Sequence, residues 1–164
     1  MTTLETKSQK TTDFCISDIV INGTIQEVFA FFTKRIDAWW PQSYRFSEDG
    51  IIGIELETGG VCYEDIEDGR RLKWGHVIDV QPAHSLTIAW QISPMRLLIE
   101  NMDDASTVCV EFEEHTNKTH IQIKHRDFQK HAEGWQEYLE AMKSPAGWPY
   151  CLEHLQKAFE AQES

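Results

Sequence analysis

Two histidines in alternating apolar runs are the residues of this sequence best placed to do chemistry. His76 falls on the same predicted strand face as Trp74. His125 falls on the same face as Ile121 and Ile123. Because side chains alternate across a strand, both imidazoles are predicted to point inward, where an imidazole can act as a base or bind an acidic ligand. The alternative is that each is a neutral imidazole hydrogen-bonded within the wall.

The acidic residues form mostly adjacent pairs near predicted turns, of which Glu67-Asp68 is one example. Adjacent strand residues point to opposite faces, so these pairs are not catalytic dyads. Glu64 is the exception, because it becomes a candidate acid if it faces the interior with Tyr63 outward. If Tyr63 faces inward instead, its ring contributes to an aromatic wall.

No metal or cofactor site is predicted. The seven histidines and four cysteines are scattered along the chain, and they match no zinc-binding spacing. His76 and His125 lie on strands separated by two others, about 14 Å apart at about 4.8 Å per strand, which is too far to share one ion. The sequence also lacks the G-x-S-x-G, P-loop and G-x-G-x-x-G motifs, so the balance favours a protein that is not an enzyme.

Aromatic residues make up 11% of the chain, and six residues are tryptophans. Rigid aromatic side chains can line a hydrophobic pocket, since they offer a large contact area at low entropic cost. An equal alternative is that they simply fill the core. The predicted ligand-binding residues are Trp39, Trp40, Tyr63, Trp74, His76, Trp90, His125, Trp148 and Leu152.

Composition excludes some classes of partner. Acidic residues outnumber basic ones by 27 to 15, which gives a net charge of −12 at pH 7. Proteins that bind nucleic acids usually carry a basic surface patch, and proteins that bind anionic membranes carry basic segments. Neither a nucleic acid nor a membrane is therefore expected as a partner. Residues 1–12 are polar and contain no apolar signal-peptide region, so a cytoplasmic location is expected.

The predicted elements begin with a strand and a short helix. β-Branched residues predict the strand over 13–22, and the capping box Thr24–Glu27 then starts a helix of about ten residues. About six further runs of alternating apolar residues predict meandering strands. Turn signals between these runs favour antiparallel neighbours, and they fall at 68–69, 81–84 and 116–118.

The C-terminal part is predicted to be helical. Apolar residues at helical spacing predict an amphipathic helix over 148–159, with a further helical stretch at 130–143. Residues 1–12 are predicted to be a disordered tail, and 13–164 a single domain. A curved antiparallel sheet of about seven strands wrapped around a long C-terminal helix is the helix-grip arrangement, an α+β fold.

Several short motifs occur in order along residues 13–160. They are Phe29–Thr33, Trp39-Trp40-Pro41, Gly59-Gly60, Trp74–Val77, Trp90, His125 with Phe128, and Gly147-Trp148 with Leu152 and Leu155. The series resembles the family called activator of heat shock protein 90 ATPase homologue-like, of the START-like (SRPBCC, Bet v 1-like) superfamily. The resemblance implies a helix-grip fold that commonly leaves a gap between sheet and helix. The segments 93–105 and 130–143 depart from the family pattern, so the resemblance does not define the outline of any pocket.

Three functions compete. A binding module would hold a small hydrophobic or amphipathic molecule between sheet and helix, and the fold and the aromatic content favour it. The family name implies an alternative in which a surface patch binds a chaperone, heat shock protein 90, or another protein. A cyclase- or hydrolase-like enzyme needs a polar group at the pocket wall, for which His76, His125 and Glu64 qualify. A homodimer also stays open, because related domains are often dimeric.

Overall fold

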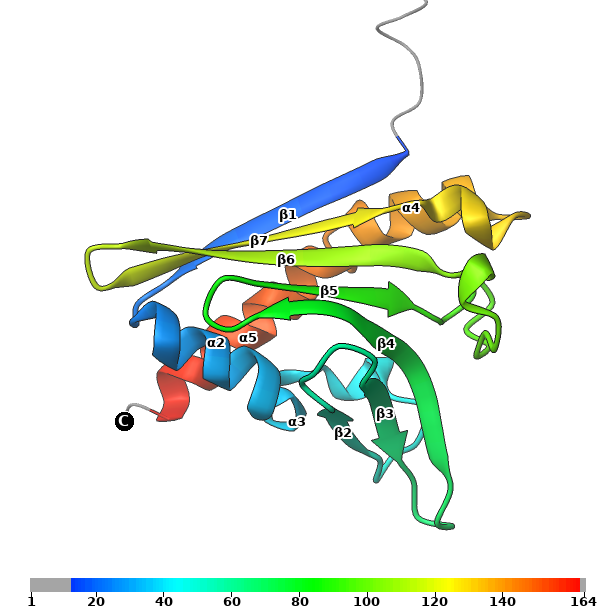
Figure 1. Cartoon of the computed structure of the whole chain (residues 1–164), viewed down its shortest axis with the longest axis horizontal. Coiled ribbons are helices and arrows are strands. Elements are labelled where there is room, and N and C mark those ends of the chain that lie inside the picture. Colours follow the sequence, from blue (N-terminus) through cyan, green and yellow to red (C-terminus); the bar gives the residue numbers. More distant parts are fainter. Residues whose placement is uncertain (1–12, 163–164) are drawn as a thin grey trace, which may run out of the picture.

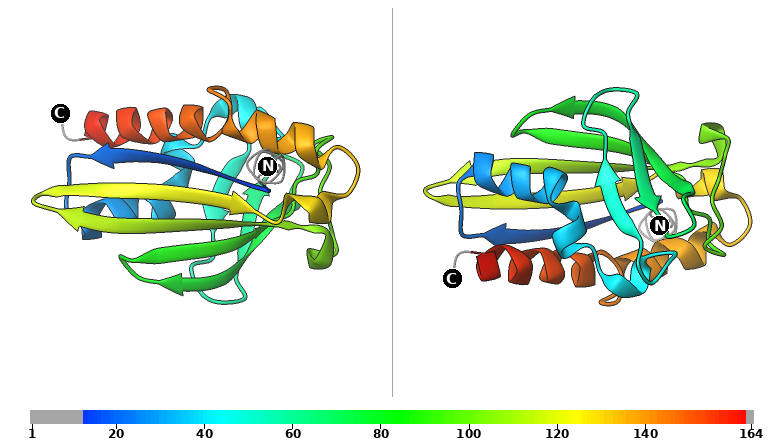
Figure 2. Two further views of the ribbon diagram at one scale, coloured as in Figure 1. Left: turned by 90° about the horizontal axis from the view of Figure 1, so that it is seen from above. Right: turned by 90° about the horizontal axis from the view of Figure 1, so that it is seen from below.

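A computed structural model describes residues 13–162, and the predicted tail at 1–12 and the last two residues lie outside this range. The described chain forms a seven-stranded antiparallel sheet that curls around helices on its concave side (Figures 1 and 2). The predicted α+β helix-grip fold is therefore confirmed.

The sheet has the strand order β1-β7-β6-β5-β4-β3-β2. Strands that follow one another from β2 to β7 are also neighbours in space, which confirms the predicted meander. The first strand pairs with the last, so β1 and β2 form the two edges. The strands are β1 (Phe14–Ile21), β2 (Ile51–Ile54), β3 (Val61–Asp65), β4 (Arg71–Gln81), β5 (Ser85–Trp90), β6 (Ser106–His115) and β7 (Lys118–Arg126).

The helices close the space between these two edges. In Figure 2 the last helix, α5, runs alongside β1, and α3 lies between α5 and β2. The predicted C-terminal helical region consists of two helices, α4 and α5, separated by residues 144–147. The α-helices are α2 (Ile25–Lys34), α3 (Ile36–Trp39), α4 (Trp135–Lys143) and α5 (Trp148–Gln162), and the 3-10 turns are η1 (Gln42–Tyr44), η2 (Met102–Asp104) and η3 (Phe128–His131).

The predicted capping box starts α2. The Thr24 hydroxyl accepts from the Glu27 N–H at 3.2 Å, and the Glu27 carboxylate accepts from the Thr24 N–H at 3.1 Å. The apolar face of the helix then packs Phe29 edge-on against Phe112 of β6, with 5.0 Å between the ring centroids. The α2 helix is thereby fixed across the concave face of the sheet, ahead of α3.

Strand β4 holds one residue more than its partner at two places. Trp74 has no partner residue on β3, and Ile78 has no partner residue on β5, so each position is a β-bulge. Each extra residue disturbs the alternation of inward and outward side chains. Val77 is consequently 2% exposed, whereas Ile78 is 44% exposed. The prediction that His76 points inward is wrong for this reason, and its ring is instead hydrogen-bonded to Gln91 on the outer side of the sheet.

Glu64 is fully buried and holds the segment 41–50 against β3. Its two carboxylate oxygens accept hydrogen bonds from the backbone N–H groups of Phe46 (2.9 Å) and Ser47 (2.8 Å). Of the two alternatives considered for β3, the one with Glu64 inward is therefore observed. Both oxygens are bonded within the wall, so the carboxylate has a structural role rather than that of a free acid.

Arg45 holds the same segment from its other end. Its side chain is 8% exposed and forms an ion pair with Asp37 at 2.6 Å. The guanidinium also donates to the carbonyl oxygen of Trp40 at 2.9 Å and to that of Gly50 at 3.0 Å. These bonds fix the backbone of Trp40 where α3 ends.

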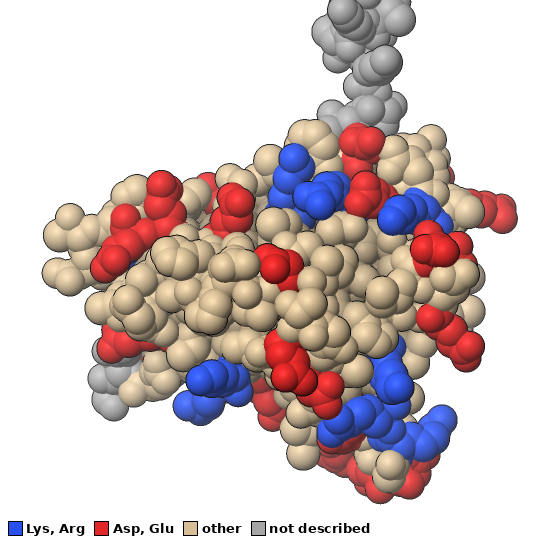
Figure 3. Space-filling model, in the orientation of Figure 1, with Lys and Arg blue, Asp and Glu red and all other residues tan. Residues whose placement is uncertain are grey.

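Figure 3 shows how charged side chains are distributed on one face of the molecule. On the face shown in Figure 3, basic side chains lie in small groups among acidic ones, and the middle of the face is largely uncharged. Within residues 13–162, no helix is long and apolar enough to cross a membrane.

The Glu64 contacts lead to a prediction for stability. In Glu64→Gln one backbone N–H loses its charged acceptor and faces the amide NH₂, so we expect the free energy of unfolding to fall by about 2–3 kcal/mol. Urea denaturation measures this change. Glu57→Gln, at an exposed position of the turn before β3, is the matched control and should behave as wild type. Equal stability of the two variants would contradict the role assigned to Glu64.

Candidate functional site

Five tryptophans meet on the concave side of the sheet, and we call them the tryptophan cluster. They come from the end of α3 and the residue that caps it, and from β4, β5 and α5. Trp40 stacks on Trp74, with 5.7 Å between centroids and 15° between the ring planes. Trp90 meets Trp148 edge-on at 5.3 Å. Trp39 joins through Trp40 at 5.5 Å. None of the five is more than 8% exposed, so the cluster is a packed part of the core.

The tryptophan cluster fills most of the space that the sequence analysis predicted as a ligand cavity. A cavity of about 20 Å³ remains between sheet and helices, which is room for about one water molecule. Trp74 lines this inner cavity, and among the described residues its Nε1 is buried without a hydrogen-bond partner. The inner cavity as it stands is too small for an organic ligand.

A larger pocket of about 250 Å³ opens beside the cluster, and we call it the outer pocket. Trp40 and Trp90 line both the outer pocket and the inner cavity, so their rings form the wall between the two. The outer pocket is lined by Trp40, Tyr44, Trp90, Ile92, Pro94, Arg96, Tyr138, Ala141, Met142, Ser144, Ala146, Gly147 and Cys151. Its walls therefore come from the segment after β5 and from the junction of α4 with α5.

The polar atoms of the pocket wall are largely engaged. The Tyr138 hydroxyl accepts from Trp90 Nε1 at 2.7 Å and donates to the carbonyl oxygen of Ile92 at 2.8 Å. Burial raises the pKa of Tyr138 to about 12, against a smaller lowering by the bond from Trp90. Burial likewise raises the pKa of the Cys151 thiol to about 12. Both groups therefore keep their protons at neutral pH.

Arg96 is the charged residue among those that line the outer pocket. Its guanidinium donates to the carbonyl oxygen of Tyr44 at 2.7 Å and lies 5.1 Å from the ring centroid of Phe46. A guanidinium has five N–H donors, so this bond leaves donors for a ligand. The pocket thus combines apolar walls with one positive charge.

His125 is fully buried beneath the cluster and is bonded at both ring nitrogens. Trp148 Nε1 donates to His125 Nδ1 at 3.0 Å, which leaves the proton of the neutral imidazole on Nε2. His125 Nε2 lies 2.7 Å from the Ser106 hydroxyl, and the same hydroxyl lies 2.7 Å from His131 Nε2. The prediction that His125 points inward is confirmed. Of the two alternatives for its role, the neutral imidazole hydrogen-bonded within the wall is observed.

Two other predicted residues lie on the far side of the sheet. The Tyr63 ring packs under the guanidinium of Arg71, 3.7 Å from its centroid. His76 lines a hollow on the outer face together with Lys73 and Leu98. Neither residue lines the outer pocket or the inner cavity.

The remaining predicted residues are brought together. Trp40 and Trp90 line the outer pocket, while Trp39, Trp74 and Trp148 line the inner cavity. Leu152, which is 1% exposed, lies in the buried core.

Sequence reasoning missed most of the outer-pocket wall. Its missed residues come from 92–96 and 138–147, together with Tyr44 and Cys151. The available signal was that 93–105 and 130–143 depart from the family pattern, which left the outline of any pocket undefined and named none of its residues.

The buried histidines predict a pH dependence. Burial lowers the pKa of His131 to about 4, while Asp104 acts weakly in the opposite sense, and burial with nearby His131 lowers the pKa of His125 well below its usual value. Below pH of about 6.5 the unfolded chain binds protons that the folded chain excludes, so stability falls as pH falls toward about 4. We expect His131→Gln to lose less stability than wild type between pH 7 and pH 5 in urea denaturation. His84→Gln, at an exposed position, should match wild type, and equal losses in all three proteins would contradict the assignment.

Comparison with solved structures identifies chains of the same fold. An anthrahydroquino-γ-pyrone synthase, Txn09, is 24% identical, with a TM-score of 0.65 over 90% of this chain and 97% of its own. The self-sacrificing resistance protein CalC from Micromonospora echinospora is 22% identical, with a TM-score of 0.65 over 91% and 95%. Protein MLL2253 from Mesorhizobium loti is 16% identical, with a TM-score of 0.64 over 90% and 97%. No curated protein matches the sequence.

The family comparison covers most of the chain. The family model described as activator of Hsp90 ATPase homolog 1-like protein matches residues 22–160, a span that includes the tryptophan cluster and the outer pocket. The resemblance seen in the sequence motifs is thereby confirmed, and the chain belongs to the activator of Hsp90 ATPase homolog 1-like family, with the START-like fold.

Proposed function

We propose that the outer pocket binds a small, flat, amphipathic molecule. Its ring would lie against Trp40 and Trp90, and its anionic or acceptor group would lie near Arg96. The observation that carries the proposal is an apolar pocket of about 250 Å³ with rigid aromatic walls and one cation. Ligand sites in proteins commonly combine apolar walls with a few placed polar groups in this way.

The volume sets the size of the ligand. Sites for drug-sized molecules usually measure about 300–1,000 Å³, so the outer pocket, at about 250 Å³, suits a somewhat smaller molecule. Pro94, Tyr138 and Ala141 also border a second, shallow hollow of about 740 Å³. A longer ligand would extend from the pocket over Tyr138 into this hollow.

The tryptophan cluster supplies the inner end of the proposed site. Trp40 separates the outer pocket from the inner cavity, so rotation of its ring would join the two spaces. The unpartnered Nε1 of Trp74 would then lie within reach of a ligand acceptor, which would relieve the cost of a buried donor without a partner. The predicted ligand residues Trp39, Trp148 and Leu152 would support this inner end.

The name of one structural relative supports a ring-shaped ligand. The name of Txn09 describes a synthase for an anthrahydroquino-γ-pyrone, a fused-ring compound, and its structure is a complex with SUM. A flat ring of this type would match the aromatic wall formed by Trp40 and Trp90.

Binding is favoured over catalysis by the state of the pocket groups. The Tyr138 hydroxyl is bonded to Trp90 and Ile92, and the Cys151 thiol keeps its proton at neutral pH. His76 lies on the opposite side of the sheet, and His125 is bonded at both nitrogens. The candidate acids and bases from the sequence are therefore engaged elsewhere.

A fluorescent probe tests the proposal. 8-Anilinonaphthalene-1-sulfonate combines a flat naphthalene ring with an anionic sulfonate, and we expect it to bind with increased fluorescence. Ala146→Trp places a large ring at the pocket mouth and should abolish binding, whereas Ala161→Trp, exposed in the last turn of α5, should not. Arg96→Gln should weaken binding about tenfold through loss of a charge-assisted hydrogen bond. Equal binding by both tryptophan variants would exclude the outer pocket as the binding site.

A protein partner is the second candidate, favoured by one segment. The loop after β5 exposes large apolar side chains, with Met95 at 79% and Leu97 at 66%. Clustered exposed apolar residues often mark a binding surface for another protein, and the family name points to heat shock protein 90.

Chaperone activation tests this second candidate. We expect the chain to stimulate the ATPase activity of heat shock protein 90, and Met95→Lys and Leu97→Lys to reduce the stimulation at least fivefold. Ile51→Lys, on the edge strand β2 at a position 59% exposed, is the matched control. No stimulation by the wild-type chain would remove this candidate.

A further inference from the structure

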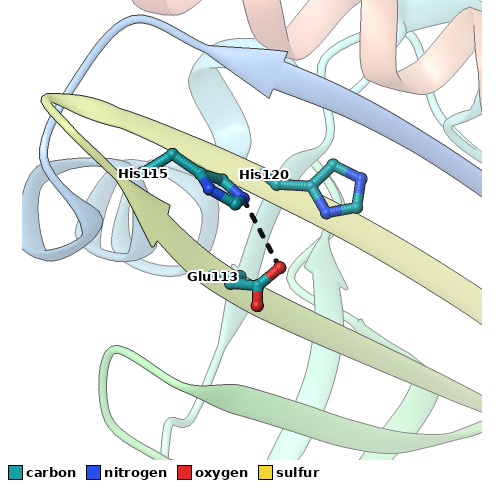
Figure 4. A group of neighbouring side chains, drawn as sticks. All are labelled: Glu113, His115 and His120. Carbon is teal, nitrogen blue, oxygen red and sulfur yellow. Dashed lines mark ion pairs between the residues drawn. The ribbon is translucent and has the colours of Figure 1, made fainter.

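Three potential metal ligands meet on the outer face of the β6–β7 hairpin. Glu113 and His115 lie on β6 and His120 lies on β7 (Figure 4), and we call them the hairpin cluster. One ligand atom from each residue lies within 4.8 Å of the other two. The hairpin cluster is on the opposite face from the outer pocket and shares no residue with it.

Strand pairing creates this proximity. Glu113 is directly opposite His120 in the register of β6 and β7, so their side chains share one face. His115 is two residues after Glu113 and therefore points to the same face. Asn117, with φ of 58°, lies in the tight turn that brings the strands back. Residues that are five or seven positions apart in sequence thus become neighbours.

The distances suit a small divalent ion. His115 Nε2 lies 3.4 Å from a Glu113 carboxylate oxygen, which is long for a charged hydrogen bond. Zinc ligands at about 2.0–2.1 Å in a tetrahedral shell lie about 3.3 Å from one another. This pair therefore already has the spacing of two zinc ligands, and small side-chain rotations would bring the third atom in.

Asp18 of β1 contacts His120 and orients its ring for binding a metal ion. The Asp18 carboxylate lies 2.8 Å from His120 Nε2. A proton on Nε2 would be donated to this carboxylate, which leaves the lone pair of Nδ1 free for a metal. Metal-binding histidines commonly donate their other N–H to a carboxylate in this manner.

We propose that the hairpin cluster binds a divalent transition-metal ion, with Zn²⁺ as the reference ion. Two imidazoles and one carboxylate are ligands that zinc prefers, and three protein ligands leave a coordination position open. The side chains of Glu113 and His115 are 71% and 58% exposed, so an ion can enter from solution. Glu111 and His84 border a hollow of about 430 Å³ beside Glu113 and His120, where a small molecule on the open position would lie.

This metal site could not be recognised from the spacing of residues along the sequence. Zinc motifs are recognised from ligands at fixed spacing along one segment, and the sequence analysis predicted no metal for that reason. Here the ligands are set by a cross-strand register.

Calorimetric titration of the full chain with Zn²⁺ tests the proposal. We expect one ion to bind, and His115→Ala, His120→Ala and Glu113→Gln each to weaken it at least tenfold. Asp18→Asn should weaken binding about tenfold by removing the carboxylate that orients His120. His154→Ala, a histidine on α5, and Cys109→Ser, the partly exposed thiol, are controls that should bind as wild type.

Two further measurements distinguish Zn²⁺ binding at the hairpin cluster from Zn²⁺ binding elsewhere on the chain. In imidazole NMR spectra Zn²⁺ should shift the His115 and His120 resonances and leave those of His154 in place. Affinity should fall on acidification, because protons compete with the metal for the ring nitrogens, and Cu²⁺ should bind more tightly than Zn²⁺. Absence of binding by the wild-type chain, or unchanged affinity in His115→Ala and His120→Ala, would overturn the proposal. Ala146→Trp, which blocks the outer pocket, should leave Zn²⁺ binding unchanged.

Discussion

The packing of Trp40 between α3, the sheet and α5 is the contact on which the candidate site depends. Its ring stacks on Trp74 and lies 6.2 Å from the centroids of both Trp90 and Trp148. Large rigid rings fill a gap at little entropic cost, so the space that the helix-grip topology leaves between sheet and helix is closed by side chains. Because Trp40 lines both the inner cavity and the outer pocket, the position of one ring decides how the free volume is divided.

Trp40 is held in turn by two buried charged groups. Arg45 donates to its carbonyl oxygen, and Glu64 accepts from the backbone of the segment that follows. The segment 41–50 contains little regular secondary structure, so these side chains satisfy backbone groups that a helix or strand would otherwise satisfy. The aromatic site therefore depends on polar contacts that lie outside it. Neither Arg45 nor Glu64 lines the outer pocket. Substitution of either residue would nevertheless make the pocket wall less rigid, because both hold the backbone next to Trp40.

Local patterns in the sequence predicted the strands, the capped helix α2 and most turns, because those features depend on residues close in sequence. The side of the sheet on which His76 lies could not be predicted. The β-bulges at Trp74 and Ile78 disturb the alternation of inward and outward side chains, and the spacing of apolar residues does not indicate them. The outer pocket was missed since its walls, 92–96 and 138–147, meet only in the folded chain. The strand and helix patterns and the family resemblance both predicted the fold. They left open whether the tryptophans line a cavity or fill the core, because that depends on how the rings pack in the folded chain.

One hairpin serves both faces of the sheet because its side chains alternate. On β6, Phe112 points inward and packs on Phe29 of α2, while Glu113 points outward to His120. Strand β7 pairs with β6 as far as His115, whereas β5 pairs with it only as far as Glu111. The part of β6 that lines the core is therefore held on both sides, so an ion bound at the hairpin cluster beyond it would move the inner face little. The rings of the aromatic wall are largely buried, whereas the side chains of Glu113 and His115 in the hairpin cluster are exposed to solution. The two sites should therefore bind their ligands independently, with no coupling free energy between them.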